Sequence, residues 1–343
     1  MKNFENKLSD ALAGDLEGST DVQLAPVKGD DIRRSLPREY FEKKPLLFLG
    51  KMLLAFVIIV CGWLAIYFAL NIEVSWYSLL AGSIGFVLCG LIYTHLIELQ
   101  HECLHYHAFK SAFLNRLLGV TAGAFMLSSH SHYRYDHLRH HAYLGTERNM
   151  EHFNYRFNDL NSISGFLTAF FDLNRYKNVG SILVSALNGS KIEGITKDLA
   201  QRHIKQEYVI YAALVILSIA LSFYFSTWLI VLAWWLPTLI IAEGAHFMIE
   251  MPEHYGLNTQ TAPDVLENTR TIKTNWLIAW FVNGNHTHAA HHYHHGVPMC
   301  NLKFVHELIK PKLQIVEISY TQFFRDVISG RITHKSDATC MPR

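Results

Sequence analysis

"MLLAFVIIVCGWLAIYFALNIEVSWYSLLAGSIGFVLCGLIYT", the stretch from Met52 to Thr94, decides the fold of this chain. It contains two runs without any Asp, Glu, Lys or Arg, Met52–Leu70 and Val74–Thr94, separated only by Asn-Ile-Glu. A helix rises about 1.5 Å per residue, so each run is long enough to cross a bilayer core of about 30 Å. The stretch therefore predicts two membrane-spanning helices joined by a tight turn.

A second pair of apolar runs follows later in the chain. Tyr208–Phe225 and Trp228–Ile249 are separated only by Ser226–Thr227. The alternative to membrane spans is a large soluble helical core, but soluble helices average about a dozen residues and carry a polar face. We therefore expect an all-α membrane protein with four transmembrane helices in two hairpins.

The distribution of basic residues predicts the orientation of these helices. The two turns contain no Lys or Arg, whereas the N-terminal arm, the loop 95–207 and the C-terminal tail are rich in both. The positive-inside rule places these three segments in the cytosol. We therefore expect an integral membrane protein with both termini, and every histidine cluster, on the cytosolic side in a helical cap.

Two shorter apolar stretches, Phe113–Leu127 and Ile163–Leu187, carry aromatic residues beside Arg and Lys. They are typical of interfacial helices at the headgroup level, or of ordinary helices inside the cap. The net charge of +1 offers no argument for nucleic acid. The five cysteines include no CxxC pair, which argues against a disulfide framework or a zinc ribbon.

Histidine is the outlier in composition, with 21 in the chain. In "HLIELQHECLHYH", His101 and His105 are spaced i, i+4 and share one helix face with Glu98. In "HLRHH", His137, His140 and His141 again share one side of a helix.

Further polar residues accompany these two clusters. Asp136 is placed to orient an imidazole from behind. The i, i+2 spacing of His130 and His132 does not face a common point on a helix, so we expect both outside the ligand set.

A third cluster, "GNHTHAAHHYHHGVP", fits the pattern H-x-x-H-H twice. The two registers are His288/His291/His292 and His291/His294/His295. Eight nitrogen ligands are too many for one tetrahedral zinc, and no cysteine accompanies them. They suit two metals of higher coordination number. A zinc transporter would need polar residues through the membrane centre, and the first three apolar runs offer almost none.

The three clusters resemble the histidine boxes of the membrane fatty acid desaturase superfamily, which includes related hydroxylases and acetylenases. The resemblance rests on "HECLH", "HLRHH" and "HTHAAHH", on "PEHYG" and "DVLENTRT" before the third box, and on "GVPMCNL" after it. It implies a transmembrane catalytic domain over 45–308, preceded by a polar cytosolic arm over 1–44 and followed by a cytosolic tail over 309–343.

The resemblance also implies a set of ligands for two irons. They are His101, His105, His137, His140, His141, His254, His288, His291 and His292. The third box takes its first register because Val297–Pro298 follows at the family's spacing. The additional ligand is expected to be His254 in "MPEHYG", with His246 as the alternative.

The implied function is an oxygen-dependent fatty acyl desaturase with two iron ions (Fe2+) and O2. The chain has neither a ferredoxin-like cysteine set nor a His-Pro-Gly-Gly motif, so electrons are expected from a separate ferredoxin or cytochrome b5-type donor protein. The substrate would be an acyl chain on a lipid, coenzyme A or a carrier protein, reached through the lipid bilayer.

Two kinds of alternative remain. Within the superfamily, the chain fits a hydroxylase, an acetylenase or a carotenoid-modifying oxygenase. From another class, it fits a histidine-rich membrane metal-binding or transport protein. Arg270 in "ENTRT" is expected either to bind a headgroup or a carboxylate of the cap, or to be one more cytosolic arginine.

Overall fold

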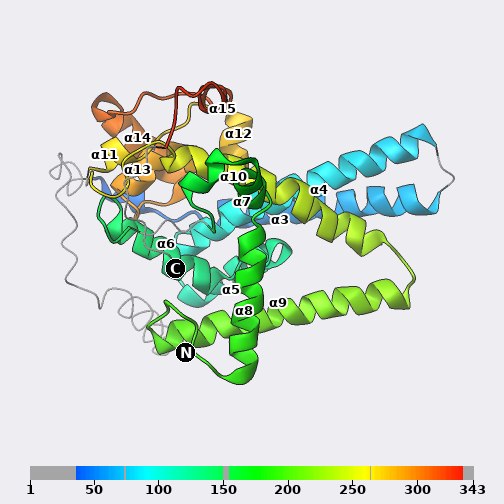
Figure 1. The fold of residues 1–343 in the computed structure, drawn as a ribbon. Helices are drawn as coiled ribbons and strands as arrows, with labels where there is room; N and C mark the ends of the chain where they lie inside the picture. The colour runs from blue at the N-terminus through cyan, green and yellow to red at the C-terminus, as the bar shows by residue number, and fades with distance from the viewer. Residues whose placement is uncertain (1–35, 73–74, 150–153, 263, 335–343) are drawn as a thin grey trace.

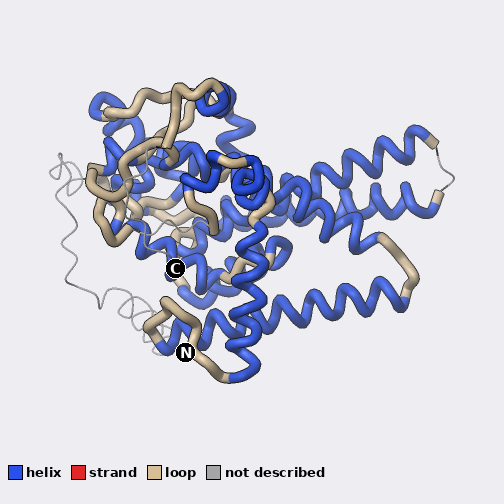
Figure 2. The backbone as a smooth tube through the Cα atoms, viewed as in Figure 1, coloured by secondary structure: helices blue, strands red, loops and turns tan. Residues whose placement is uncertain are grey.

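The computed structural model describes residues 36–72, 75–149, 154–262 and 264–334. All regular elements in these residues are helical (Figure 2). A single isolated bridge pairs Ile272 with Ile318. The predicted N-terminal arm therefore lies largely outside the described residues, as does the end of the tail.

Four helices are long and apolar enough to cross a membrane, which confirms the prediction of an all-α protein with four candidate spans: Arg38–Asn71, Trp76–Leu104, Asp198–Tyr224 and Val231–His254. Within these spans the regular elements are η1 (Arg38–Phe41), α3 (Pro45–Asn71), α4 (Trp76–Leu104), α9 (Asp198–Tyr224), η4 (Val231–Trp235), η5 (Thr238–Ala242) and α10 (Glu243–His254).

The remaining elements are shorter. Between α4 and α9 lie α5 (Ala112–Gly123), η2 (Ala124–Met126), α6 (His130–Tyr143), η3 (Phe157–Asn161), α7 (Ile163–Phe170) and α8 (Leu173–Asn188). After α10 come α11 (Val265–Asn268), α12 (Trp276–Phe281), η6 (Asn285–Thr287), α13 (His288–Tyr293), η7 (Met299–Asn301), α14 (Leu302–Ile309), η8 (Lys310–Lys312) and α15 (Tyr320–Ile328).

The first two spans pack along each other through small residues. A Cβ atom added to Gly85 would lie 2.7 Å from the carbonyl oxygen of Gly62, so only glycine allows this approach. Farther along the same interface, the indole of Trp63 donates to the hydroxyl of Tyr93 at 2.9 Å. Short contacts between backbones are how helices associate in a membrane.

The fourth span packs against α4 and contains two π-helical stretches, η4 and η5, on either side of Pro237. Proline has no N–H, so it cannot donate to the carbonyl of Ala233 as residue i+4 of an α-helix would. The hydroxyl of Tyr93 donates to this carbonyl at 2.5 Å. Thr94 similarly donates to the carbonyl of Ala242 at 3.0 Å. Side chains of α4 thus satisfy backbone groups of the irregular fourth span.

Figure 1 shows the C-terminal end of α3, the N-terminal end of α4 and the turn after α9 at one end of the molecule, on the right. The short helices α6, α11, α13 and α14 gather at the other end. Large apolar side chains are exposed along the spans, among them Leu53, Val60, Leu80 and Leu217. Such extended apolar surface is typical of a protein that lies in lipid.

The short apolar stretches form helices as expected. Phe113–Leu127 folds as α5 and η2, and Ile163–Leu187 folds as α7 and most of α8. Phe113 and Leu187 are exposed, as interfacial side chains would be. Their depth in a membrane stays a prediction.

The short helices gathered at the end opposite to these turns, here called the cap, have their own apolar clusters. Leu302 and Val305 of α14 pack with Tyr293 of α13, and Tyr40 of η1 packs against this cluster. Asn301 donates to the carbonyl oxygens of Tyr40 and Glu42 at 3.1 and 2.9 Å. A second cluster contains the fully buried Phe323 of α15 and Tyr255. Residues on both sides of the predicted boundaries at 44/45 and 308/309 therefore contribute to the cap.

Candidate metal centre

Three helices and the end of a fourth place the predicted histidines. His101 lies in the last turn of α4 and His105 is the C-cap residue of that helix. The second box lies on α6, whose N-terminus is capped by Ser129, and the third box forms most of α13. His254 is the last residue of α10. The nine predicted ligands thus come from α6, from α13 and from the C-terminal ends of α4 and α10.

A first group of imidazoles converges through its Nε2 atoms. The Nε2 of His137 lies 2.8 Å from that of His101, 3.0 Å from that of His105 and 2.9 Å from that of His141. The Nε2 of His291 lies 2.9 Å from that of His141 and 3.4 Å from that of His137. Five rings from three segments of the chain therefore aim one nitrogen each at a common region.

A second group lies beside the first. The Nε2 of His254 lies 3.2 Å from the Nε2 atoms of both His140 and His288. The Nε2 of His292 lies 3.0 Å from that of His288. The rings of His141 and His292, one from each group, have centroids 4.2 Å apart, so the two groups are neighbours.

These separations suit metal coordination. Two nitrogens bound at right angles to one ion, each at about 2.1 Å, lie about 3.0 Å apart. In the second group, three Nδ1 atoms are anchored: that of His140 by Asn149 at 3.1 Å, that of His288 by Asn285 at 3.0 Å and that of His254 by the carbonyl of Asn268 at 2.9 Å. An Nδ1–H that donates outward leaves the Nε2 lone pair for a metal. The donor set therefore fits two adjacent metal ions.

The electrostatics of the cluster favour neutral imidazoles. Burial, followed by the neighbouring imidazoles, lowers the pKa well below its ordinary value for five of them: His105, His141, His288, His291 and His292. The neutral ring is the form that binds metal. Several buried lone pairs that face one another are stabilised by a cation between them.

Sequence reasoning missed one carboxylate at the second group. The Oε2 of Glu253 lies 3.3 Å from the Nε2 of His288, and its Oε1 accepts from the side chain of Asn285 at 2.8 Å. Glu253, His254 and His288 could together hold a metal ion by their spacing. The available signal was position alone, because Glu253 directly precedes His254 in the sequence.

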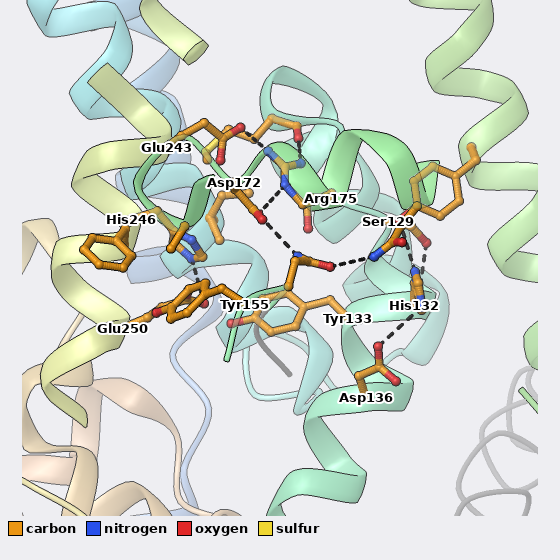
Figure 3. A pocket seen from close by; sticks show the side chains of 18 residues that line it. Ser129, His132, Tyr133, Asp136, Tyr155, Asp172, Arg175, Glu243, His246 and Glu250 are labelled. Carbon is orange, nitrogen blue, oxygen red and sulfur yellow. Dashed lines mark hydrogen bonds and ion pairs between the residues drawn. The ribbon is translucent and has the colours of Figure 1, made fainter. Parts of the chain in front are cut away.

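The two candidates for the additional ligand lie in different places. His254 joins the second group, whereas the Nε2 of His246 lies 3.3 Å from the Oε1 of Glu250 (Figure 3). His246 lies on the same helix, two turns before His254, and its side chain lines a pocket.

The two registers of the third box also separate. His291 and His292 aim their Nε2 atoms into the two groups, whereas the ring of His294 packs edge-on against Phe41 at 5.0 Å. His295 lies at the border, with its ring centroid 5.2 Å from that of His141. His107 has a similar position, because its buried ring is 5.2 Å from that of His105.

His130 and His132 take part in other contacts. His130 is buried against Gly119 of α5, and burial lowers its pKa to about 3. His132 lies 3.1 Å from the hydroxyl of Tyr208 and 3.4 Å from the carboxylate of Asp136. Asp136 therefore does orient an imidazole, but it is the imidazole of His132 and not that of a predicted ligand.

Arg270 differs from the expectation of a headgroup or carboxylate partner. It is buried and donates to the carbonyl oxygens of Pro252 and Tyr255 at the end of α10, with its guanidinium 5.0 Å from the ring centroid of Phe323. Burial lowers its pKa to about 10, so it stays charged at neutral pH. The last carbonyls of a helix lack hydrogen-bond partners within the helix, and Arg270 supplies a donor to two such carbonyls at the end of α10.

Comparison with known proteins agrees with this geometry. No curated protein matches the chain. The family described as "Fatty acid desaturase" matches residues 76–324, which is well over half of the chain and includes every histidine of both groups. The chain therefore belongs to the fatty acid desaturase family of membrane oxidoreductases.

Proposed function

We propose that this protein is an oxygen-dependent, integral-membrane fatty acyl desaturase whose nine converging histidines hold a pair of iron ions. The observation that carries the proposal is the convergence of nine Nε2 atoms in two adjacent groups beside four apolar spans. Imidazole nitrogens are suitable ligands for iron, and the two groups of histidines could bind one ion each.

The first ion would be held by His101, His105, His137, His141 and His291. The second would be held by His140, His254, His288 and His292, with Glu253 at its side. Two bound irons supply the activation of O2 that removal of hydrogen from an unactivated C–H bond requires.

The chain's own residues provide the setting. All ligands except His105 and His141 are buried, and those two are only partly exposed, so the centre is kept from bulk water. The asparagines behind His140 and His288 fix the direction of the rings, which positions the metals against a bound substrate. α4 and α10 join the centre directly to two membrane spans.

This continuity supports a topology. We propose that the four spans form two hairpins and that the cap, the active site and both termini face the cytosol, since the basic residues are concentrated in the arm, the loop and the tail. Electrons would come from a separate ferredoxin or cytochrome b5-type protein that docks on the cap. The acyl chain, on a lipid, coenzyme A or a carrier, would enter from the bilayer.

Lipid analysis of a bacterial host that expresses the full chain tests the reaction. A new unsaturated acyl species, absent from cells that express His140→Ala, is expected. A hydroxylated or acetylenic product would instead assign the chain to a hydroxylase or acetylenase. A carotenoid product would assign it to that branch of the superfamily.

Metal analysis of the purified protein tests the other class. We expect about two irons per chain, in line with two groups of imidazole ligands. For this test the protein is expressed and reconstituted with excess iron. If it then contains zinc in place of iron and takes up no oxygen when a reductant is supplied, the proposal of an enzyme is refuted and a metal carrier is favoured.

A further inference from the structure

A second polar site lies beside the histidine cluster. It is a pocket between the end of α4, α6, α8 and α10, shown in Figure 3. Tyr133 lines this pocket, and its ring centroid is 5.6 Å from that of His137 and 6.0 Å from that of His101. The ring of Tyr133 is therefore a wall that the pocket shares with the candidate metal centre.

The pocket and the metal centre share one face of α10. On α10, Glu243, Phe247, Glu250 and His254 follow one another at spacings of four, three and four residues, which places them on one side. The first three line the pocket and the last belongs to the second histidine group. A molecule in the pocket would thus lie beside the second histidine group.

Carboxyl groups predominate among the ionisable side chains of the pocket. Among the described residues that line it, Asp136, Asp172, Glu243 and Glu250 contribute carboxyl groups and Arg175 contributes the one guanidinium. Two histidines in the wall, His132 and His246, each pair with one of these carboxylates.

The one guanidinium is fully engaged. Arg175 donates to Asp172 at 2.8 Å, and it also donates to Glu243 and to the carbonyl of Met126. Two carboxylates share this one cation, so it has little left to offer an anionic ligand. A carboxylate or phosphate head placed here would meet several carboxyl groups and a guanidinium that is already paired.

One carboxylate oxygen in the pocket lacks a donor. Glu243 is 2% exposed, and among the described residues its Oε2 has no hydrogen-bond partner. Among the described residues the Oδ1 of Asp172 lacks a partner as well. A buried acceptor without a donor is costly, so both oxygens favour a ligand that brings N–H groups.

The other walls suit a cation joined to a hydrocarbon. Four aromatic rings line the pocket, those of Tyr133, Tyr155, Tyr208 and Phe247. Aromatic faces attract ammonium groups, most strongly where water is excluded. Ile97 and Met126 add apolar surface for an attached alkyl chain.

We propose that this pocket binds the protonated amine head of the substrate, so that the reacting acyl chain belongs to an amphiphile with an ammonium group. The proposal rests on the proposed function, because it names the substrate class of that same centre. The head lies among Glu243, Asp172 and the aromatic rings, and the chain passes Tyr133 toward the histidines.

Binding of three matched probes to the full purified chain in a neutral detergent tests this. The probes are octadecylamine, octadecanol and octadecanoate, which share one chain length and differ in head charge. We expect octadecylamine to bind at least about tenfold more tightly than either of the others, measured near neutral pH by displacement of a fluorescent long-chain probe. Equal affinity for amine and alcohol, or tighter binding of octadecanoate, would overturn the proposal.

Two variants locate the binding, Glu243→Gln and Glu250→Gln. Each keeps the shape of the side chain and removes one negative charge. We expect a loss of about tenfold in amine affinity with octadecanol binding unchanged. The matched control is Glu307→Gln, the same substitution at an exposed position of α14. A monodisperse elution profile and normal iron content identify variants that fold, and amine affinity unchanged in both folded variants would contradict the assignment.

The two proposals fail separately. Amine binding is measured on protein with and without its iron, so it does not depend on turnover. Selective amine binding without any oxygen-dependent product would contradict the proposed function but not the assignment of the pocket. A new product from a lipid without an amine, together with no preference for octadecylamine, would contradict the assignment of the pocket but not the proposed function.

Discussion

The Nε2 atoms of His140 and His254 lie 3.2 Å apart although 114 residues separate these two histidines in the chain. α6 and the end of the fourth span meet at this point, so the contact joins the cap to the membrane part. Each ring is held from behind, His140 by Asn149 and His254 by the backbone of Asn268. The pair is therefore built to aim both nitrogens at one place.

The pair predicts unequal effects for two histidines on one helix. We expect His254→Ala to lose about half or more of the bound iron and nearly all activity, because one group loses a ligand and outer partners cannot replace it. His246→Ala should keep its iron, since His246 lies against Glu250. Iron per chain by elemental analysis checks both variants. Equal iron loss in the two would show that the assignment of His254 is wrong.

Arg270 predicts a stability effect away from the metals. Arg270→Ala leaves the carbonyls of Pro252 and Tyr255 without their donor at the end of α10, just before the second histidine group. A buried charged hydrogen bond of this kind contributes about 2–4 kcal/mol. We expect a clearly lower melting temperature in detergent, with Arg270→Lys only partly restoring it because lysine cannot bond in a fork.

Arg202→Ala supplies the comparison for this variant. Arg202 is an exposed arginine on α9, so its loss should change the melting temperature little. A melting temperature for Arg270→Ala that matches the value for Arg202→Ala would contradict the role given to Arg270.

The main features of the fold were accessible from sequence because the membrane imposes a simple rule. A predominantly apolar run of some 20 residues must be helical in lipid, and all four runs are. Their ends were less accessible. α9 begins at Asp198, ten residues before the apolar run at Tyr208, because polar side chains such as Gln201 and Glu207 continue the helix and are buried inside the cap. Hydropathy does not detect that continuation.

The candidate site divides in the same way. Spacing on a helix predicted which histidines share a face, since such spacing is local. It could not predict that neighbouring histidines of one box point to different groups, as His140 does to one and His141 to the other. It also could not predict Glu253, because a carboxylate joins the site only through the approach of α13 to α10. These features depend on tertiary packing.

The packing of α3 on α4 predicts a position-dependent effect of added volume. We expect Gly85→Val to lower the melting temperature in detergent, because a Cβ there would lie 2.7 Å from the carbonyl oxygen of Gly62 on α3. Overpacking of this kind costs about 1–3 kcal/mol or more when backbone atoms must move. Gly50→Val on α3 is the control, since nothing lies within 4 Å of a Cβ at that position. Similar melting temperatures for the two variants would refute the close approach.

The buried histidines predict that the metal-free protein is sensitive to acid. Burial lowers the pKa of His130 to about 3, whereas the same side chain in the unfolded chain has a pKa of about 6.5. The unfolded imidazole therefore takes up a proton below pH 6.5 while the folded one stays neutral. The stability that follows is complete above about pH 6.5 and falls by roughly 1.4 kcal/mol per pH unit for each such histidine as the pH drops toward the folded pKa.

Thermal unfolding of chelator-treated protein between about pH 8 and pH 5 measures this effect. We expect a constant melting temperature above about pH 7 and a progressive loss below about pH 6.5, shallower in His130→Asn because one proton-uptake site is gone. His130 lies under α5 and outside both histidine groups, so this variant should also bind iron normally. A wild-type melting temperature that stays constant down to pH 5 would contradict the inference, because it would mean that the buried imidazoles already carry protons in the folded state.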